Sequence, residues 1–255
     1  MHNVIALLTD FGCRSGYAAQ VKATILKHVE HIEKVIQFID ISHNIRSFQI
    51  DQAGFVLKLN YKWFPKNSLF LVVVDPGVGT DRAVIGVKSH DMVFIAPDNG
   101  VLSSILTDIE KIVAIKGTSA TFAGRDVFAK AAAELISGKQ LEEIGTEYKR
   151  QPKLIEIEPE ITDSTVSGKV LHIDDFGNVI SNIESSLIYQ GNKVKWGNII
   201  VSEWVKNYSQ IEKCGKKIGN IINSSGYLEL AAFKNSAEKL TDLKIGSIVK
   251  AASIK

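Results

Sequence analysis

The sequence predicts an α/β protein with an N-terminal α/β sandwich-type domain, whose sheet is mostly parallel, and a smaller C-terminal domain that is antiparallel and β-barrel-like. Over the first 150 residues, short apolar runs alternate with segments of helical spacing, as expected for strands covered by helices. Beyond Thr165 the apolar segments are short and glycine turns separate them, which is typical of antiparallel strands. Pro152 and Pro159 bracket a mixed stretch, and no proline follows it. We therefore place the boundary within residues 151–162, between domains at 1–155 and 160–255.

The individual elements follow from the apolar pattern. Continuous apolar runs are typical of strands buried on both faces, and in the first domain they occupy residues 4–8, 35–39, 69–74, 83–87 and 92–96. Helices are expected where apolar residues recur at helical spacing, at residues 17–29, from about residue 50, after residue 99 and over residues 126–137. In the second domain, the predicted strands are residues 166–173, 194–201, 227–230 and 247–252.

Charge and composition exclude several classes of protein. The 255 residues carry 30 basic and 28 acidic side chains, and a net charge of +2 provides no electrostatic basis for binding nucleic acid or a membrane surface. No apolar run approaches the roughly 18 residues of a membrane span. Cys13 and Cys214 cannot form a disulfide framework, and the six histidines lack the spacing of metal ligands, so no metal or other cofactor is expected. The N-terminus lacks a signal-peptide pattern, which favours a cytoplasmic protein.

Three aspartates follow predicted strands. Asp10, Asp40 and Asp75 each come after an apolar run, and ligands of α/β sheets bind at the edge formed by the carboxyl ends of parallel strands. An ionised Asp10 can accept hydrogen bonds from both hydroxyls of a ribose. For any one of the three, a helix N-cap is an equally good interpretation.

Two loops carry the other candidate groups. From Asp75 to Arg82, the loop can return the guanidinium to the carboxylate, where the pair orients a water; a purely structural ion pair explains the same residues equally well. The glycines of this loop lack the spacing of a phosphate-binding motif. In the second domain, residues 174–178 and 223–227 taken alone are most simply read as polar turns.

Seven short motifs together resemble one family. In chain order they are Leu8-Thr9-Asp10-Phe11-Gly12, Asp40-Ile41-Ser42-His43, Asp75-Pro76-Gly77-Val78-Gly79-Thr80, Ala96-Pro97-Asp98-Asn99-Gly100, Gly124-Arg125-Asp126-Val127-Phe128, Asp174-Asp175-Phe176-Gly177-Asn178 and Asn223-Ser224-Ser225-Gly226-Tyr227. The series is similar to the S-adenosyl-methionine hydrolase (adenosine-forming) family, which is related to the fluorinase and chlorinase enzymes. The resemblance runs from residue 4 to about residue 250.

The resemblance implies a metal-independent hydrolase that cleaves S-adenosyl-L-methionine with water at ribose C5′, giving adenosine and L-methionine. It also implies a homotrimer, with each site between the N-terminal domain of one subunit and the C-terminal domain of its neighbour. Asp75 and Arg82 match residues that handle the attacking water, and we expect them to be catalytic. The matching substrate-binding residues are Asp10 for the ribose, Phe48 against the substrate, Asp174 for the methionine ammonium with Phe176 in the same turn, Asn178 for adenine, and Ser224 and Ser225 for the amino-acid end.

One departure from the family pattern bears on catalysis. Ala123 stands immediately before Gly124, where the family's water-handling set has a histidine. Because alanine has no proton to exchange, a second interpretation is a protein that binds S-adenosyl-methionine or adenosine with impaired or lost catalysis. A third is a halogenase, which is disfavoured because Asp75 takes the place of the halogenases' tyrosine. Phe233 and Lys234 also differ from the family's usual adenine pocket.

Overall fold

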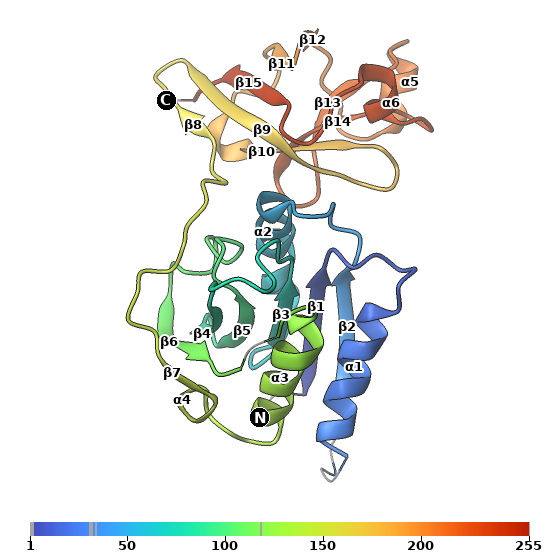
Figure 1. Cartoon of the computed structure of the whole chain (residues 1–255). Coiled ribbons are helices and arrows are strands. Elements are labelled where there is room, and N and C mark those ends of the chain that lie inside the picture. Colours follow the sequence, from blue (N-terminus) through green and yellow to red (C-terminus); the bar gives the residue numbers. More distant parts are fainter. Residues whose placement is uncertain (1–2, 31–32, 34, 118, 255) are drawn as a thin grey trace. The chain divides into compact units, whose positions relative to one another are not determined.

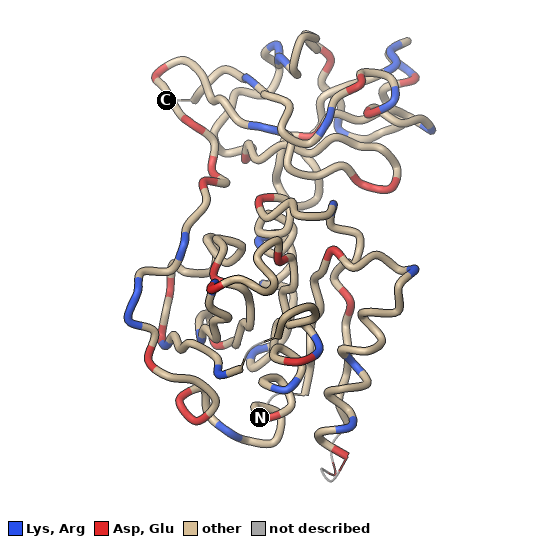
Figure 2. The backbone as a smooth tube through the Cα atoms, viewed as in Figure 1, with Lys and Arg blue, Asp and Glu red and all other residues tan. Residues whose placement is uncertain are grey.

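The structure, a computed structural model, describes residues 3–30, 33, 35–117 and 119–254. The chain divides into two compact units, Met1–Glu156 and Ile157–Lys255 (Figure 1). Lys and Arg are interspersed with Asp and Glu along both units (Figure 2). Within the described part of the chain, no helix is long and apolar enough to cross a membrane.

A seven-stranded mixed sheet forms the centre of the first unit, with the strand order β2-β1-β3-β5-β4-β6-β7. β1 pairs in parallel with β2 and β3, and β3 pairs in parallel with β5, whereas the pairings of β4 and β6 are antiparallel. The strands are β1 (Val4–Thr9), β2 (Gln37–Ser42), β3 (Leu69–Val73), β4 (Val84–Ser89), β5 (Met92–Pro97), β6 (Ile109–Ile115) and β7 (Gly145–Glu147).

Helices cover both faces of this sheet (Figure 1). They are α1 (Tyr17–His28), α2 (Ile50–Asn60), α3 (Ala129–Ile136) and α4 (Leu141–Ile144), with the short helices η1 (Tyr61–Trp63) and the π-helical η2 (Gly124–Phe128). Alternate residues of β3 enter opposite cores: Leu69, Leu71 and Val73 pack with α1 and α3, whereas Phe70 and Val72 pack with α2. Because both faces are covered, β3 is buried along its whole length, which explains its continuous apolar sequence.

Two predictions for the first unit are wrong. Residues 101–107 form successive turns, where a helix was expected after Asn99. The Ser103 hydroxyl donates to the Gly100 carbonyl at 2.6 Å and accepts the Ile155 N–H at 2.8 Å, so side-chain bonds replace the helical pattern there. The second strand is Gln37–Ser42, which places Asp40 inside the strand.

The second unit is an eight-stranded antiparallel sheet, in which seven strands follow the order β12-β11-β15-β9-β10-β14-β13 and β8 pairs with β9. The strands are β8 (Glu160–Ile161), β9 (Thr165–Ile173), β10 (Val179–Glu184), β11 (Val194–Trp196), β12 (Ile199–Val201), β13 (Gly219–Ile222), β14 (Tyr227–Ala231) and β15 (Ile248–Ala252). The short helices are η3 (Ser185–Leu187), α5 (Ser209–Lys213) and α6 (Ala237–Thr241).

The two ends of this sheet come together. Trp204, which follows β12, forms a β-bridge with Asn220 of β13, and the buried Trp196 donates its indole N–H to the Asn220 side chain at 2.9 Å. The sheet is therefore nearly closed, and the prediction of a barrel-like antiparallel domain is confirmed. The predicted strand over residues 194–201 is instead the hairpin β11–β12, because Gly197 reverses the chain with a φ of +54°.

Candidate active site

Asp10 follows β1, and polar contacts hold the backbone around it. Thr9 is fully buried, and its hydroxyl lies 2.8 Å from His43 Nδ1 and accepts the Phe11 N–H at 3.2 Å. The Gly12 N–H donates to the His43 carbonyl at 2.7 Å, and Gly12 has a φ of +66°, which glycine adopts without strain. These bonds tie the segment after β1 to the segment after β2 and place Asp10 at the carboxyl end of the parallel strands.

The carboxylate of Asp10 is partly withdrawn from water. The Phe48 N–H donates to Asp10 Oδ2 at 3.1 Å, and Phe48 takes a φ of 69°, which is uncommon for a residue with a side chain. Burial raises the pKa of Asp10, the Phe48 N–H opposes that rise, and the charge of Asp75 adds to it. The Phe48 ring itself is 68% exposed.

Asp75 and Arg82 form a two-point ion pair. Arg82 Nε donates to Asp75 Oδ1 at 2.9 Å, and Arg82 Nη2 donates to Asp75 Oδ2. The Asp75 side chain is 2% exposed and that of Arg82 is 12% exposed. The Gly77 N–H adds a donor to Oδ1 at 3.2 Å, and a Cβ at Gly77 would lie 2.9 Å from Arg82 Cγ. The tight loop thus requires glycine at position 77 for Arg82 to reach Asp75.

Asp10 and Asp75 line one cavity of about 380 Å³ in the first unit. Phe11, Tyr17 and Phe122 form its aromatic wall, with ring centroids 5.9 Å (Phe11–Tyr17), 5.5 Å (Phe11–Phe122) and 5.1 Å (Tyr17–Phe122) apart. The two carboxylates expected to act on the ribose and on water therefore share a space bounded by apolar rings.

Ala123 borders this cavity and also a neighbouring cavity of about 340 Å³ that Arg82 lines. It is 1% exposed and directly precedes η2, and π-helical turns are frequent at functional sites. Position 123 is therefore where a longer side chain would enter the space beside the Asp75–Arg82 pair.

The second unit carries its own cavity of about 560 Å³. Its lining residues are Asp174, Phe176, Asn178, Tyr208, Ala232, Phe233, Lys234 and Asn235. Asp174 organises the β9–β10 turn: its Oδ1 accepts the N–H groups of Phe176 at 3.0 Å and of Asn178 at 2.9 Å, and its Oδ2 accepts the Asn178 side-chain amide at 2.9 Å. The Phe176 ring is 81% exposed.

The structure thus gathers the predicted site residues into two groups. Asp10 and Asp75 belong to the first unit's cavity, with Arg82 beside it, and Asp174, Phe176 and Asn178 belong to the second unit's cavity. The other three predicted site residues line neither the first unit's cavity nor the second unit's cavity. They are Phe48, Ser224 and Ser225, and all three are exposed. The two serines lie in the β13–β14 turn.

Several residues in or near these cavities were not predicted as site residues from the sequence. Tyr17 and Phe122 of the first cavity's aromatic wall and Tyr208 in the second cavity lie outside all seven motifs. Glu229 is also new: it is 2% exposed on β14, and burial raises its pKa to about 7. A charged residue in the middle of the otherwise apolar segment Tyr227–Ala231 was a signal that could have identified it.

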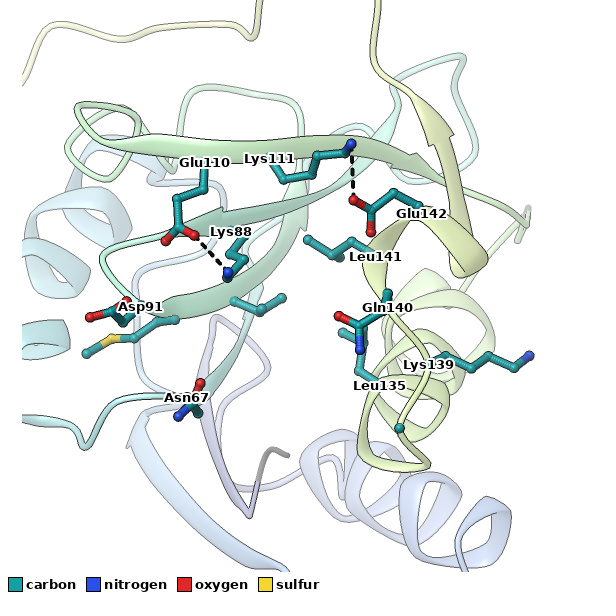
Figure 3. A pocket seen from close by; sticks show the side chains of 13 residues that line it. Asn67, Lys88, Asp91, Glu110, Lys111, Leu135, Lys139, Gln140, Leu141 and Glu142 are labelled. Atoms are coloured by element: carbon teal, nitrogen blue, oxygen red, sulfur yellow. Dashed lines mark ion pairs between the residues drawn. The ribbon is translucent and has the colours of Figure 1, made fainter.

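A further cavity of about 380 Å³ lies beside β4, β6 and α4 of the first unit (Figure 3). Four of its charged groups are paired with one another, Lys88 with Glu110 at 2.7 Å and Lys111 with Glu142 at 3.0 Å. It contains none of the predicted site residues. Among all described residues, which exclude His2 and His31, no group of three or more His, Cys, Asp or Glu is arranged to hold a metal ion.

Comparisons with known proteins cover nearly the whole chain. The profile of the SAM hydroxide adenosyltransferase N-terminal domain matches residues 5–145, and that of the C-terminal domain matches residues 168–250. The chain is 32% identical over 258 residues to a (R)-S-adenosyl-L-methionine hydrolase of Methanocaldococcus jannaschii, covering 94% of this chain and 92% of that protein. A protein of the same name from Thermus thermophilus is 29% identical over 262 residues, with 96% and 98% covered.

A more distant relative and a solved structure also match nearly the whole chain. A fluorinase of Actinopolyspora mzabensis is 23% identical over 295 residues, with 97% of this chain and 96% of that protein covered. The crystal structure of an uncharacterized conserved protein from Thermotoga maritima matches with a TM-score of 0.85 and 32% identity, covering 96% of this chain and 98% of that chain.

Proposed function

This chain belongs to the SAM hydroxide adenosyltransferase family, and from that premise we propose that it hydrolyses S-adenosyl-L-methionine at ribose C5′ to adenosine and L-methionine. The observation that carries the proposal is the shared cavity of Asp10 and Asp75, beside which Arg82 is held on Asp75 by two hydrogen bonds.

The reaction needs little from the protein besides positioning. The water oxygen bonds to C5′ as the C5′–S bond breaks, the electron pair leaves with sulfur, and one proton is released. Because the sulfonium leaves as a neutral thioether, neither an acid for the leaving group nor an oxyanion hole is needed. What remains is to hold a water in line behind C5′ and to keep bulk solvent out, which the aromatic wall of the cavity favours.

Asp75 is the proposed acceptor of the water's proton. A carboxylate offers about four lone-pair sites, and Arg82 and Gly77 occupy three of those on Asp75. The remaining site on Oδ2 is available to a water molecule, whose orientation Arg82 and Asp75 set together. Ala123 supplies no proton acceptor, so in this chain the pair acts without a third group.

The other predicted residues complete the substrate site. We assign them as Asp10 to the ribose hydroxyls, Phe48 to the substrate's apolar surface, Asp174 to the methionine ammonium, Phe176 and Asn178 to adenine, and Ser224 and Ser225 to the amino-acid end. Each unit carries only part of this set, which supports a homotrimer whose sites join the N-terminal part of one subunit to the C-terminal part of its neighbour. A cytoplasmic location is part of the same proposal.

A product assay tests the function. The purified chain is incubated with S-adenosyl-L-methionine in halide-free buffer, and we expect adenosine and methionine in equal amounts. Because the relatives' names specify the (R) form, the two sulfonium epimers are assayed separately, and the (R) epimer is the expected substrate. Absence of adenosine after long incubation at high protein concentration contradicts the proposal.

Ala123 favours a second candidate, a binding protein that has lost catalysis. This alternative predicts that S-adenosyl-methionine and adenosine raise the melting temperature of the chain while no adenosine is formed. Halogenase activity is separated in the same assay, because it would give 5′-halo-adenosine in chloride buffer and nothing in halide-free buffer. We expect adenosine in both buffers.

A further inference from the structure

Glu229 is a buried carboxylate that the proposed mechanism leaves without a role. Its neighbours on β14, Leu228 and Leu230, belong to the core of the barrel. Glu229 points to the other side, because it pairs directly with Ile221 of β13, and Ile221 and Ala231 pack in the separate cluster beside α5. That outer side is also the side of Tyr208, whose hydroxyl donates to Glu229 Oε1 at 3.2 Å.

Neutral groups hold Glu229 in place. Besides Tyr208, the Asn223 side chain bonds to the carboxyl group, while Asn223 Oδ1 accepts the N–H groups of Ser225 and Tyr227. Among the residues that the structure describes, no Lys, Arg or His forms an ion pair with Glu229 or Asp174. A buried carboxylate without a cation partner is costly when ionised, because burial penalises the charged form.

Glu229 is coupled to the cavity of the second unit. Tyr208 and Asp174 line that cavity, and the charge of Asp174 acts on both Glu229 and Tyr208. Burial, assisted by Asp174, raises the pKa of Glu229 to about 7, and burial together with Glu229 raises that of Tyr208 to about 12. The cavity therefore has one carboxyl group, Asp174, in its wall and a second, Glu229, behind Tyr208.

Other titratable groups lie near Glu229 and the cavity of the second unit. His172 of β9 lies in line with Glu229 across Ile180 of β10, and burial lowers the pKa of His172, so it loses its proton at a lower pH than Glu229 does. Asp175 is exposed in the β9–β10 turn. Lys234 lines the cavity, but its ammonium group lies over the Phe233 ring, 5.2 Å from the centroid.

We propose that Glu229, acting through Tyr208 and beside Asp174, is a positioning residue that makes the second unit's cavity selective for ligands with a positive charge, and that it releases its proton when such a ligand binds. The ligand's identity rests on the proposed function, since S-adenosyl-methionine carries a sulfonium and an ammonium group. The selectivity itself rests on the two carboxylates.

Linkage gives the direction of the pH effect. A bound cation favours the ionised form of Glu229, so affinity for a cationic ligand increases as the pH rises through about 7. A neutral nucleoside does not favour either form, and its affinity stays level. Between pH 6 and 7.5 we expect the dissociation constant of a cationic ligand to fall roughly fivefold.

Calorimetric measurement of binding to the 255-residue chain tests the proposal. The probe is sinefungin, which carries an amine in place of the sulfonium and cannot be hydrolysed, and adenosine is the neutral control. Between pH 6 and 7.5, we expect the dissociation constant of sinefungin to fall roughly fivefold, with release of a proton on binding. The dissociation constant of adenosine should not change. In Glu229→Gln, which keeps the shape of the side chain and one acceptor oxygen for the Tyr208 hydroxyl, only the probe's own titration remains.

A second variant distinguishes this role from a structural one. Tyr208→Phe removes a donor that favours ionised Glu229, so the midpoint of the pH dependence should move to higher pH, an effect that loose packing alone would not produce. Equal pH dependence in the natural chain and Glu229→Gln overturns the proposal, as does an unmoved midpoint in Tyr208→Phe. Because sinefungin binding requires no turnover, these outcomes are independent of the product assay.

Discussion

At the scale of single residues, the chemistry depends on the hydrogen bonds that Asp75 makes. Arg82 and Gly77 hold both carboxylate oxygens in a fixed orientation, with 2% of the Asp75 side chain exposed. This geometry leaves Asp75 directed at the cavity that it shares with Asp10. In the proposed mechanism, Asp75 is therefore a base held in a fixed orientation.

Replacing Asp75 with asparagine should abolish the proton acceptor while keeping the shape of the side chain. We expect kcat to fall by about 10²–10⁴-fold with a much smaller change in KM. The change also leaves Arg82 without its buried partner, at a cost of roughly 3 kcal/mol in unfolding free energy. Chemical denaturation measures that cost separately, and Arg82→Lys serves as a variant that retains the positive charge. Undiminished kcat in Asp75→Asn would exclude Asp75 as the base.

Replacing Ala123 with histidine should add the missing proton acceptor. Position 123 borders both the Asp75 cavity and the Arg82 cavity, so an imidazole there would enter the space beside the Asp75–Arg82 pair. We expect kcat to rise by about 10-fold or more. Ala123→Gln, which is similar in size but is not a base, is the matched control and should give no increase. Equal rates for the histidine, glutamine and natural chains would show that Asp75 and Arg82 suffice.

At the scale of elements, the site depends on strands that place short loops at one edge of each sheet. β1 and β3 are adjacent and parallel, so the residues that follow them, Asp10 and Asp75, face the same cavity. In the second unit, the β9–β10 turn and the strand β14 bring Asp174 close enough to Glu229 for the charge of one to shift the pKa of the other.

Glu229 on β14 should make the free energy of unfolding depend on pH. Its pKa in the folded chain, about 7, exceeds the usual 4.5, so the folded state binds the proton more tightly than the unfolded state does. The resulting stability is fully present below pH 4.5 and is lost as the pH rises through 7, by on the order of 2–3 kcal/mol. Urea unfolding at pH 5 and pH 8 measures this loss.

Glu229→Gln should remove this part of the pH dependence, since glutamine does not titrate. The exposed Asp175 provides the matched control, and Asp175→Asn should keep the slope of the natural chain. If Glu229→Gln and the natural chain lose stability equally between pH 5 and pH 8, the folded-state pKa of Glu229 is not raised.

The sequence predicted the elements whose apolar residues follow a clear strand or helix pattern. β1, β3, α1 and α2 were identified because their apolar residues follow the strand or helix period without interruption. β6 was missed because its first residues, Ile109 to Lys111, are exposed and mixed in character. The failed helix after Asn99 and the split strand at Gly197 reflect local bonds and a turn that periodicity does not encode.

The site was predictable only where its residues lie in short motifs. Asp10, Asp75, Arg82 and the turn of Asp174 were predicted because their motifs resemble those of one family, and local bonds hold the Asp75 loop and the Asp174 turn. Tyr208, Tyr17 and Phe122 were missed because they reach the cavities through packing between segments far apart in the sequence. Such contacts depend on the whole fold, and a single sequence does not display them.

At the scale of the whole molecule, the proposed trimer makes a quantitative prediction. Asp10→Asn and Asp174→Asn should each inactivate the chain when expressed alone. If each site joins two neighbouring subunits, co-expression of the two variants should restore up to about a quarter of the natural activity, because random assembly pairs intact halves at that frequency. Sites confined to one chain would give no recovery. The mass of the assembly in solution provides the accompanying check.

The central claim, that water attacks C5′ of S-adenosyl-methionine in this site, is tested most directly by running the reaction in ¹⁸O-labelled water and analysing both products by mass spectrometry. Our account predicts adenosine with one heavy oxygen in its 5′-hydroxyl group and methionine with none. Adenosine without the label, or label found in methionine, would contradict it.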